Sequence, residues 1–179
     1  VVLVTGPRQV GKTTMLQKLM EGTERSYVTL DDLNERNLAK TDPELFLQLH
    51  KPPILVDEVQ YAPELFTYIK IWVDEYHHAG DFWLTGSQVF KLMNGVQESL
   101  AGRVAVLSLT SLSQAELCGG KMEPFTVTLD SLIARKKERS KADTRDVFDR
   151  IFKGSMPAMV SGQTKNSQIF YSSYLSTYI

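Results

Sequence analysis

The sequence of 179 residues has little of several features that would point to a particular class of protein. It holds one cysteine, Cys118, so no disulfide can form within the chain, and a reducing compartment such as the cytoplasm is the expected location. No apolar run approaches the roughly 20 residues that span a bilayer, so no membrane association is expected. The 20 Lys and Arg are balanced by 21 Asp and Glu, which excludes a chain-wide basic field for nucleic acid but leaves room for a local patch.

What the sequence does contain suits a globular core. Apolar side chains make up 42% of the residues and charged side chains 23%, fractions that favour a folded globular chain over disorder or a fibrous repeat. Short apolar runs alternate with stretches in which apolar residues recur at helical spacing. The expected strands are 1–5, 27–30, 53–56, 82–84 and 104–109, and the expected helices between them are 12–21, 42–49, 63–79 and 89–100. This alternation predicts an α/β fold, a parallel sheet with helices on both faces.

Composition divides the chain into three parts. Residues 1–120 hold the alternating pattern, residues 121–143 are polar and carry a cluster of basic side chains, and residues 144–179 return to helical patterns. We expect a core domain, a charged linker or insertion, and part of a small helical domain. Because the sequence begins in an apolar strand and ends in an apolar helix without a stop signal, we expect it to be a piece of a longer protein.

A glycine loop joins the first expected strand to the first expected helix. Residues 6–13, Gly-Pro-Arg-Gln-Val-Gly-Lys-Thr, fit the phosphate-loop pattern G-x-x-x-x-G-K-[ST]. Glycines let the backbone wrap closely around phosphate oxygens, and the positive end of the following helix attracts the anion. Lys12 is therefore predicted to reach the β- and γ-phosphates, and the Thr13 hydroxyl to bind Mg²⁺. The predicted nucleotide-binding residues are Gly6, Pro7, Arg8, Gln9, Val10, Gly11, Lys12, Thr13 and Thr14.

Two acidic residues end the third expected strand. Asp57 and Glu58 follow the apolar run 53–56, where phosphate-loop proteins place the acid that holds Mg²⁺. Successive side chains leave a strand in opposite directions, so the two acids can have separate roles. We assign Mg²⁺ to Asp57 and the polarisation of an attacking water to Glu58, and this pair favours hydrolysis. A guanine-reading Asn-Lys-x-Asp pattern is absent, so ATP is preferred by elimination.

Two further positions each have an ordinary alternative. Thr85 and Ser87 follow the fourth expected strand, where either hydroxyl can sense the γ-phosphate or orient the water, while Ser87 can equally cap a helix. Arg103 lies just before the fifth expected strand. An arginine supplied by a neighbour aids phosphoryl transfer, but most lone arginines are solvated or paired at the surface. Arg8 competes with Arg103 as a phosphate contact.

Taken in order, these segments resemble the AAA-type ATPases, and more closely a bacterial and archaeal subgroup of uncertain role. The resemblance covers about residues 1–118 and rests on five segments, namely residues 6–14, 56–60, 84–87, 100–103 and 113–116. It implies a phosphate-loop sheet of order 5-1-4-3-2, the start of a small helical lid, and self-assembly into a homo-oligomer. It also implies that Ser87 senses the γ-phosphate, that Arg103 acts in trans, and that winged-helix-like and nuclease-like regions follow.

The sequence therefore predicts Mg²⁺-dependent ATP hydrolysis that drives motion between the sheet domain and the lid. The predicted catalytic residues are Lys12, Glu58, Ser87 and Arg103. One alternative is a nucleotide-gated module that binds DNA or a protein partner with incidental turnover. A small-molecule kinase is a third hypothesis, but no stretch of the sequence indicates an acceptor-binding lid.

Overall fold

The computed structural model describes residues 1–87, 89–119, 126–137 and 143–178. The chain forms two compact units, Val1–Thr110 and Ser111–Ile179, and each is described by itself. The division into 1–120, 121–143 and 144–179 stays a prediction, and residues 120–125 and 138–142 within it lie outside the described residues.

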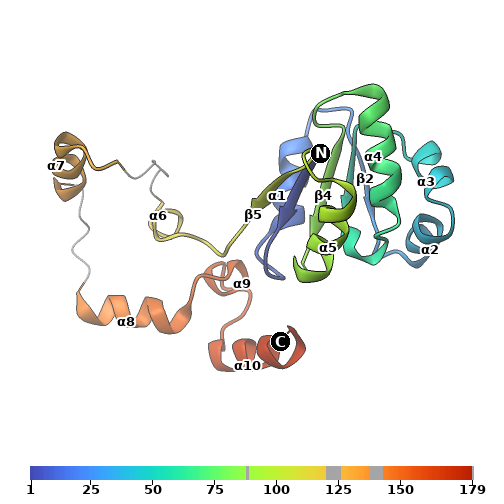
Figure 1. Cartoon of the computed structure of the whole chain (residues 1–179). Helices are drawn as coiled ribbons and strands as arrows, with labels where there is room; N and C mark the ends of the chain where they lie inside the picture. Colours follow the sequence, from blue (N-terminus) through green and yellow to red (C-terminus); the bar gives the residue numbers. More distant parts are fainter. Residues whose placement is uncertain (88, 120–125, 138–142, 179) are drawn as a thin grey trace. The chain divides into compact units, whose positions relative to one another are not determined.

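A five-stranded parallel sheet forms the centre of the first unit (Figure 1). Its strands are β1 (Val2–Thr5), β2 (Ser26–Thr29), β3 (Ile54–Asp57), β4 (Phe82–Gly86) and β5 (Ala105–Ser108). The strand order is β2-β3-β4-β1-β5, and every neighbouring pair is parallel. Read from the other edge this is 5-1-4-3-2, so the predicted fold class and the predicted order are both confirmed.

Helices pack on both faces of this sheet. They are α1 (Lys12–Met20), α2 (Leu33–Thr41), α3 (Pro43–Leu49), α4 (Leu65–Tyr76) and α5 (Val89–Ser99), and a 3₁₀ turn, η1 (Val59–Tyr61), follows β3. Alternate residues of a strand point to opposite faces, and the two apolar clusters follow this alternation. Leu3 and Ile54 pack in the cluster that contains residues of α2 to α5, whereas Val4 and Leu55 pack with Leu16 of α1.

Because the strands are parallel, all of them begin along one edge of the sheet and end along the opposite edge, and different residues lie at these two edges. All five strands end at one edge, where the loop after β1, the acidic pair after β3 and the end of β4 come together, and such an edge is where ligands bind in open α/β sheets. The strands begin at the opposite edge. There the amino group of Val1 donates to the carbonyl oxygen of Arg103 at 3.0 Å, so Arg103 lies at the edge away from the loop.

The second unit is helical in its described parts. Its helices are α6 (Gln114–Leu117), α7 (Leu129–Lys137), α8 (Thr144–Lys153), α9 (Pro157–Val160) and α10 (Ser167–Tyr178). A capping box opens α6, because the Ser113 hydroxyl accepts from the Glu116 amide at 3.2 Å. The end of α8 meets α10, where the Tyr171 phenol donates to the Lys153 carbonyl at 3.0 Å. None of the helices in the described parts of the chain combines the length and the apolar composition needed to cross a bilayer.

Candidate functional site

The loop between β1 and α1 depends on two glycines. Gly6 has a φ of 143°, and a Cβ there would lie 2.0 Å from the carbonyl oxygen of Leu109, so no larger residue fits. Gly11, with a φ of 93°, precedes α1, and no side chain caps the start of this helix. The first amide groups of α1 are therefore not used by a capping side chain, and a helix end of this kind attracts anions.

Lys12 begins α1 and is 6% exposed. Its ammonium group donates to the carbonyl oxygens of Gly6 at 3.0 Å and Pro7 at 2.8 Å, so the loop surrounds its own lysine. Burial lowers the pKa of Lys12, and the charges of Glu58 and Asp57 act in the opposite direction. The Lys12 ammonium group is thus a positive charge held close to the loop, and the charges of two carboxylates act on it. Such a site would stabilise a phosphate group together with a bound cation.

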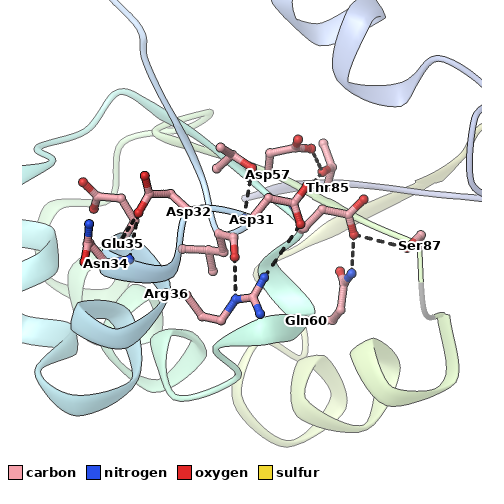
Figure 2. Close-up of polar contacts among 12 residues, drawn as sticks. Asp31, Asp32, Asn34, Glu35, Arg36, Asp57, Gln60, Thr85 and Ser87 are labelled. Atoms are coloured by element: carbon pink, nitrogen blue, oxygen red, sulfur yellow. Dashed lines mark hydrogen bonds and ion pairs between the residues drawn. The ribbon is translucent and has the colours of Figure 1, made fainter.

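Asp57 ends β3 and is also 6% exposed. Its Oδ1 accepts hydrogen bonds from the Thr13 hydroxyl at 2.8 Å and from the Thr85 hydroxyl (Figure 2), and its Oδ2 accepts from the Tyr27 phenol at 3.3 Å. Burial and the charge of Asp57 raise the pKa of Tyr27, which keeps the phenol a donor. Residues from α1, β2 and β4 therefore meet at one carboxylate.

Glu58 follows with a φ of 56°, a left-handed backbone conformation that is uncommon for residues other than glycine. Its amide donates to the Thr85 hydroxyl oxygen at 3.1 Å. Its carboxylate oxygen Oε2 accepts from the side-chain amide of Gln60 and from the Ser87 hydroxyl at 3.1 Å, as Figure 2 shows. The turn and these three contacts together fix the position of the Glu58 carboxylate.

A cavity of about 400 Å³ lies beside these groups. It is lined by Arg8, Gln9, Gly11, Lys12, Thr13, Thr14, Asp31, Glu58 and Tyr61. Arg36 supports one wall, since its guanidinium lies 3.9 Å from the centre of the Tyr61 ring and 3.8 Å from a carboxylate oxygen of Asp31. A volume of this size is within the range of about 300–1,000 Å³ found for small-molecule sites.

Comparison with known proteins agrees with this geometry. A family model described as an AAA domain matches residues 1–118. This chain belongs to the AAA domain family. The match includes the whole sheet, the loop, both acidic residues and Ser87, so the AAA domain contains every residue of the site described above.

Two curated relatives are similar to the same part of the chain. They are uncharacterized proteins of Mycobacterium bovis and Mycobacterium tuberculosis, each 37% identical over 114 residues. The match covers 63% of this chain and 25% of each relative, so it spans about a quarter of the length of these proteins. Neither relative is described with an activity.

The AAA domain brings most of the predicted site together and leaves one residue apart. Thr13 donates to Asp57, Ser87 donates to Glu58, and the charges of both acids act on the pKa of Lys12. Arg103 lies at the opposite end of the strands from the loop, because its carbonyl oxygen accepts from the amino group of Val1 before β1 begins. Its Nε and Nη2 donate to the two carboxylate oxygens of Asp74, in the last turn of α4, at 2.5 Å and 2.9 Å.

Four residues of the AAA domain belong to the site without having been predicted. Tyr27 reaches Asp57, Gln60 reaches Glu58, and Asp31 and Tyr61 line the cavity. The predicted strand order contains a signal for Tyr27, because β2 is the neighbour of β3 and Tyr27 is paired with Leu55. Gln60 ends the segment 56–60 that carries the family resemblance, but its contact with Glu58 could not be foreseen, because it forms only where η1 turns the chain back.

Proposed function

We propose that this chain binds ATP with Mg²⁺ and hydrolyses the bond between the β- and γ-phosphates. The observation that carries the proposal is the 2.8 Å contact between Thr13 Oγ1 and Asp57 Oδ1, which joins the phosphate loop to the acidic end of β3. Membership of the AAA domain family supports nucleotide binding by this loop. ATP is preferred to GTP because the sequence has no guanine-reading pattern.

Thr13 and Asp57 fit Mg²⁺ as a pair of ligands. Mg²⁺ prefers oxygen ligands and is usually held by one or two protein groups together with waters and substrate phosphates. A hydroxyl beside a buried carboxylate matches this preference. Among the residues that the structure describes, no group of three or more His, Cys, Asp or Glu forms a closed metal site, which agrees with an ion held partly by the nucleotide. When bound, Mg²⁺ neutralises charge on the phosphates.

The chain's own residues then have separate tasks. The loop amides and Lys12 bind phosphate oxygens and orient the nucleotide. Glu58 accepts a proton from a water whose oxygen attacks the γ-phosphorus, while the bond from that phosphorus to the bridging oxygen breaks and ADP leaves. Ser87, which contacts Glu58, is placed to report the γ-phosphate to the base.

Two wider parts of the proposal concern more than one domain or chain. Arg103 completes the site of a neighbouring copy, and hydrolysis drives motion between the sheet domain and the helical unit. We place the binding of a DNA or protein partner in regions outside the matched domain. The match covers about a quarter of each curated relative. These parts rest on the resemblance to AAA-type ATPases.

Two variants test the proposal. We predict that Lys12→Ala loses nucleotide binding, because the loop loses its buried cation. Glu58→Gln keeps binding and loses turnover, because an amide cannot take up the proton. Titration with a fluorescent ATP analogue measures binding, and phosphate release with Mg²⁺ or with excess chelator measures turnover.

The controls are matched residues outside the site. Lys18→Ala removes an exposed lysine of the same helix, paired with Glu21, and Glu44→Gln neutralises an exposed acid of α3. Both should bind and hydrolyse ATP like the parent chain. Normal binding by Lys12→Ala refutes the loop assignment, and undiminished turnover by Glu58→Gln refutes the base. Binding without turnover in the parent chain favours the nucleotide-gated module, and a requirement for an added acceptor favours a kinase.

A further inference from the structure

Gln60 has a buried polar atom whose position does not favour the stability of the fold. Its amide nitrogen donates to Oε2 of Glu58, while its carbonyl oxygen Oε1 is buried and has no hydrogen-bond partner among the described residues. A buried amide oxygen without a partner lowers the stability of the folded chain. β4 leaves room for this oxygen by placing Gly86 beside it, since a Cβ on Gly86 would lie 2.7 Å away.

Glu58, which accepts this hydrogen bond, also has a conformation that lowers the stability of the folded chain. Glu58 has a left-handed backbone conformation, with a φ of 56°, which costs free energy in a residue with a side chain. A strained acid and an incompletely bonded amide therefore contact each other at the edge of the cavity. Features that oppose stability concentrate where function requires them, so this contact calls for a functional explanation.

The geometry of the contact indicates its effect. Gln60 donates from the turn after β3 and Ser87 donates from the end of β4, and both reach the same oxygen, Oε2 of Glu58. One hydrogen bond leaves a carboxylate free to rotate about it, whereas two donors from different directions fix its position and its plane. The second carboxylate oxygen is then held in one orientation.

We propose that Gln60 is a positioning residue that holds the Glu58 carboxylate in the orientation needed to take a proton from the attacking water. This inference rests on the proposed function, because it concerns the base of that reaction. Gln60 itself contacts neither nucleotide nor water in this proposal and acts only through Glu58. Gly86 serves the same purpose indirectly by making space for the amide.

The test is Gln60→Met, which keeps the length of the side chain and removes both the donor and the buried carbonyl oxygen. Loss of orientation at a reacting group reduces rate by up to about 100-fold, so we expect kcat to fall between about 10- and 100-fold. The dissociation constant for a fluorescent ATP analogue should stay within about twofold, because no phosphate contact is lost. The melting temperature should stay close to that of the parent chain, because removal of the buried unpaired oxygen offsets loss of the hydrogen bond to Glu58.

Gln48→Met is the matched control, since Gln48 makes the same kind of contact on the surface of α3, donating to Glu44 at 3.4 Å. It should change neither kcat nor binding. Gln60→Ala provides a second variant, and its kcat must fall as well. Unchanged kcat in Gln60→Met, or a loss of melting temperature and binding together, overturns the positioning role while leaving the proposed function intact. Absence of turnover in the parent chain overturns the proposed function and this inference with it.

Discussion

At the scale of single residues, Thr85 holds the acidic end of β3 together. The side chain is fully buried, and its hydroxyl donates to Asp57 and accepts from the amide of Glu58 at 3.1 Å. One hydroxyl therefore satisfies a buried carboxylate and a backbone donor in a strained turn. The sequence leaves Thr85 and Ser87 as alternatives for a single role, whereas in the structure the Thr85 hydroxyl donates to the carboxylate of Asp57 and the Ser87 hydroxyl to that of Glu58.

We predict that Thr85→Val lowers the free energy of unfolding by about 2 kcal/mol, because the isosteric side chain leaves a buried amide unpaired and Asp57 with one donor fewer. Thr85→Ser is the control. It keeps the hydroxyl and loses one buried methyl group, so its cost should be about 1 kcal/mol. Urea unfolding followed by circular dichroism compares the three chains. A Val variant as stable as the parent chain would show that the hydroxyl contributes nothing.

At the scale of helices and strands, the sequence predicts those elements in which buried side chains form a recognisable pattern of apolar residues. The continuous apolar runs of β1 and β3 are strands buried on both faces, and both lie where they were expected. Helix α2 was missed, because Ala39 is its one buried residue and Leu33 is 66% exposed. That helix depends on its cap instead, where Asp32 accepts from the amide of Asn34 at 2.7 Å.

The residues of the site also divide into those that the sequence predicts and those that it does not. The loop and the pair Asp57-Glu58 are continuous in sequence, so their chemistry could be predicted from residue types and order. Neither Tyr27 nor Gln60 has a residue type that assigns it a role, although Gln60 ends the segment 56–60. Their contacts exist only once β2 lies beside β3 and η1 has turned the chain. Sequence reasoning thus finds residues that stand in the loop or at a strand end, Ser87 among them. It misses Tyr27 and Gln60, whose contacts depend on strand pairing and on the turn η1.

A prediction at this scale concerns the packing of α5 on α4. Gly95 lies within α5, and a Cβ there would be 2.8 Å from the ring of Phe66, which is fully buried in α4. Alanine improves helix propensity by about 1 kcal/mol, but overpacking a core costs about 1–3 kcal/mol. We therefore expect Gly95→Ala to be destabilising by about 1 kcal/mol in urea unfolding. Gln97→Ala, at an exposed position of the same helix, should be neutral, and a more stable Gly95→Ala would show that the ring can move.

At the scale of the whole molecule, the sheet separates two charged sites. The loop and its acids occupy the edge where the strands end, and Arg103 with Asp74 borders a hollow of about 660 Å³ at the edge where they begin. The hydrogen bond from Arg103 lowers the pKa of Asp74, which favours the charged form of this carboxylate. The ion pair is nevertheless exposed, and exposed ion pairs contribute little free energy, so Arg103 can exchange Asp74 for another anion at small cost.

Because Arg103 cannot reach the loop of its own chain, any role in hydrolysis requires a second copy. We predict that the specific ATPase rate of the parent chain rises with protein concentration and that Arg103→Ala lowers kcat about 1,000-fold, the lower end of the effect of an arginine supplied in trans. An equimolar mixture of Arg103→Ala and Glu58→Gln should then regain activity that neither variant has alone, since one copy supplies an intact base and loop and the other an intact arginine. A rate independent of concentration, together with a mixture no more active than the mean of its components, would confine catalysis to the single chain and leave Arg103 as the surface partner of Asp74.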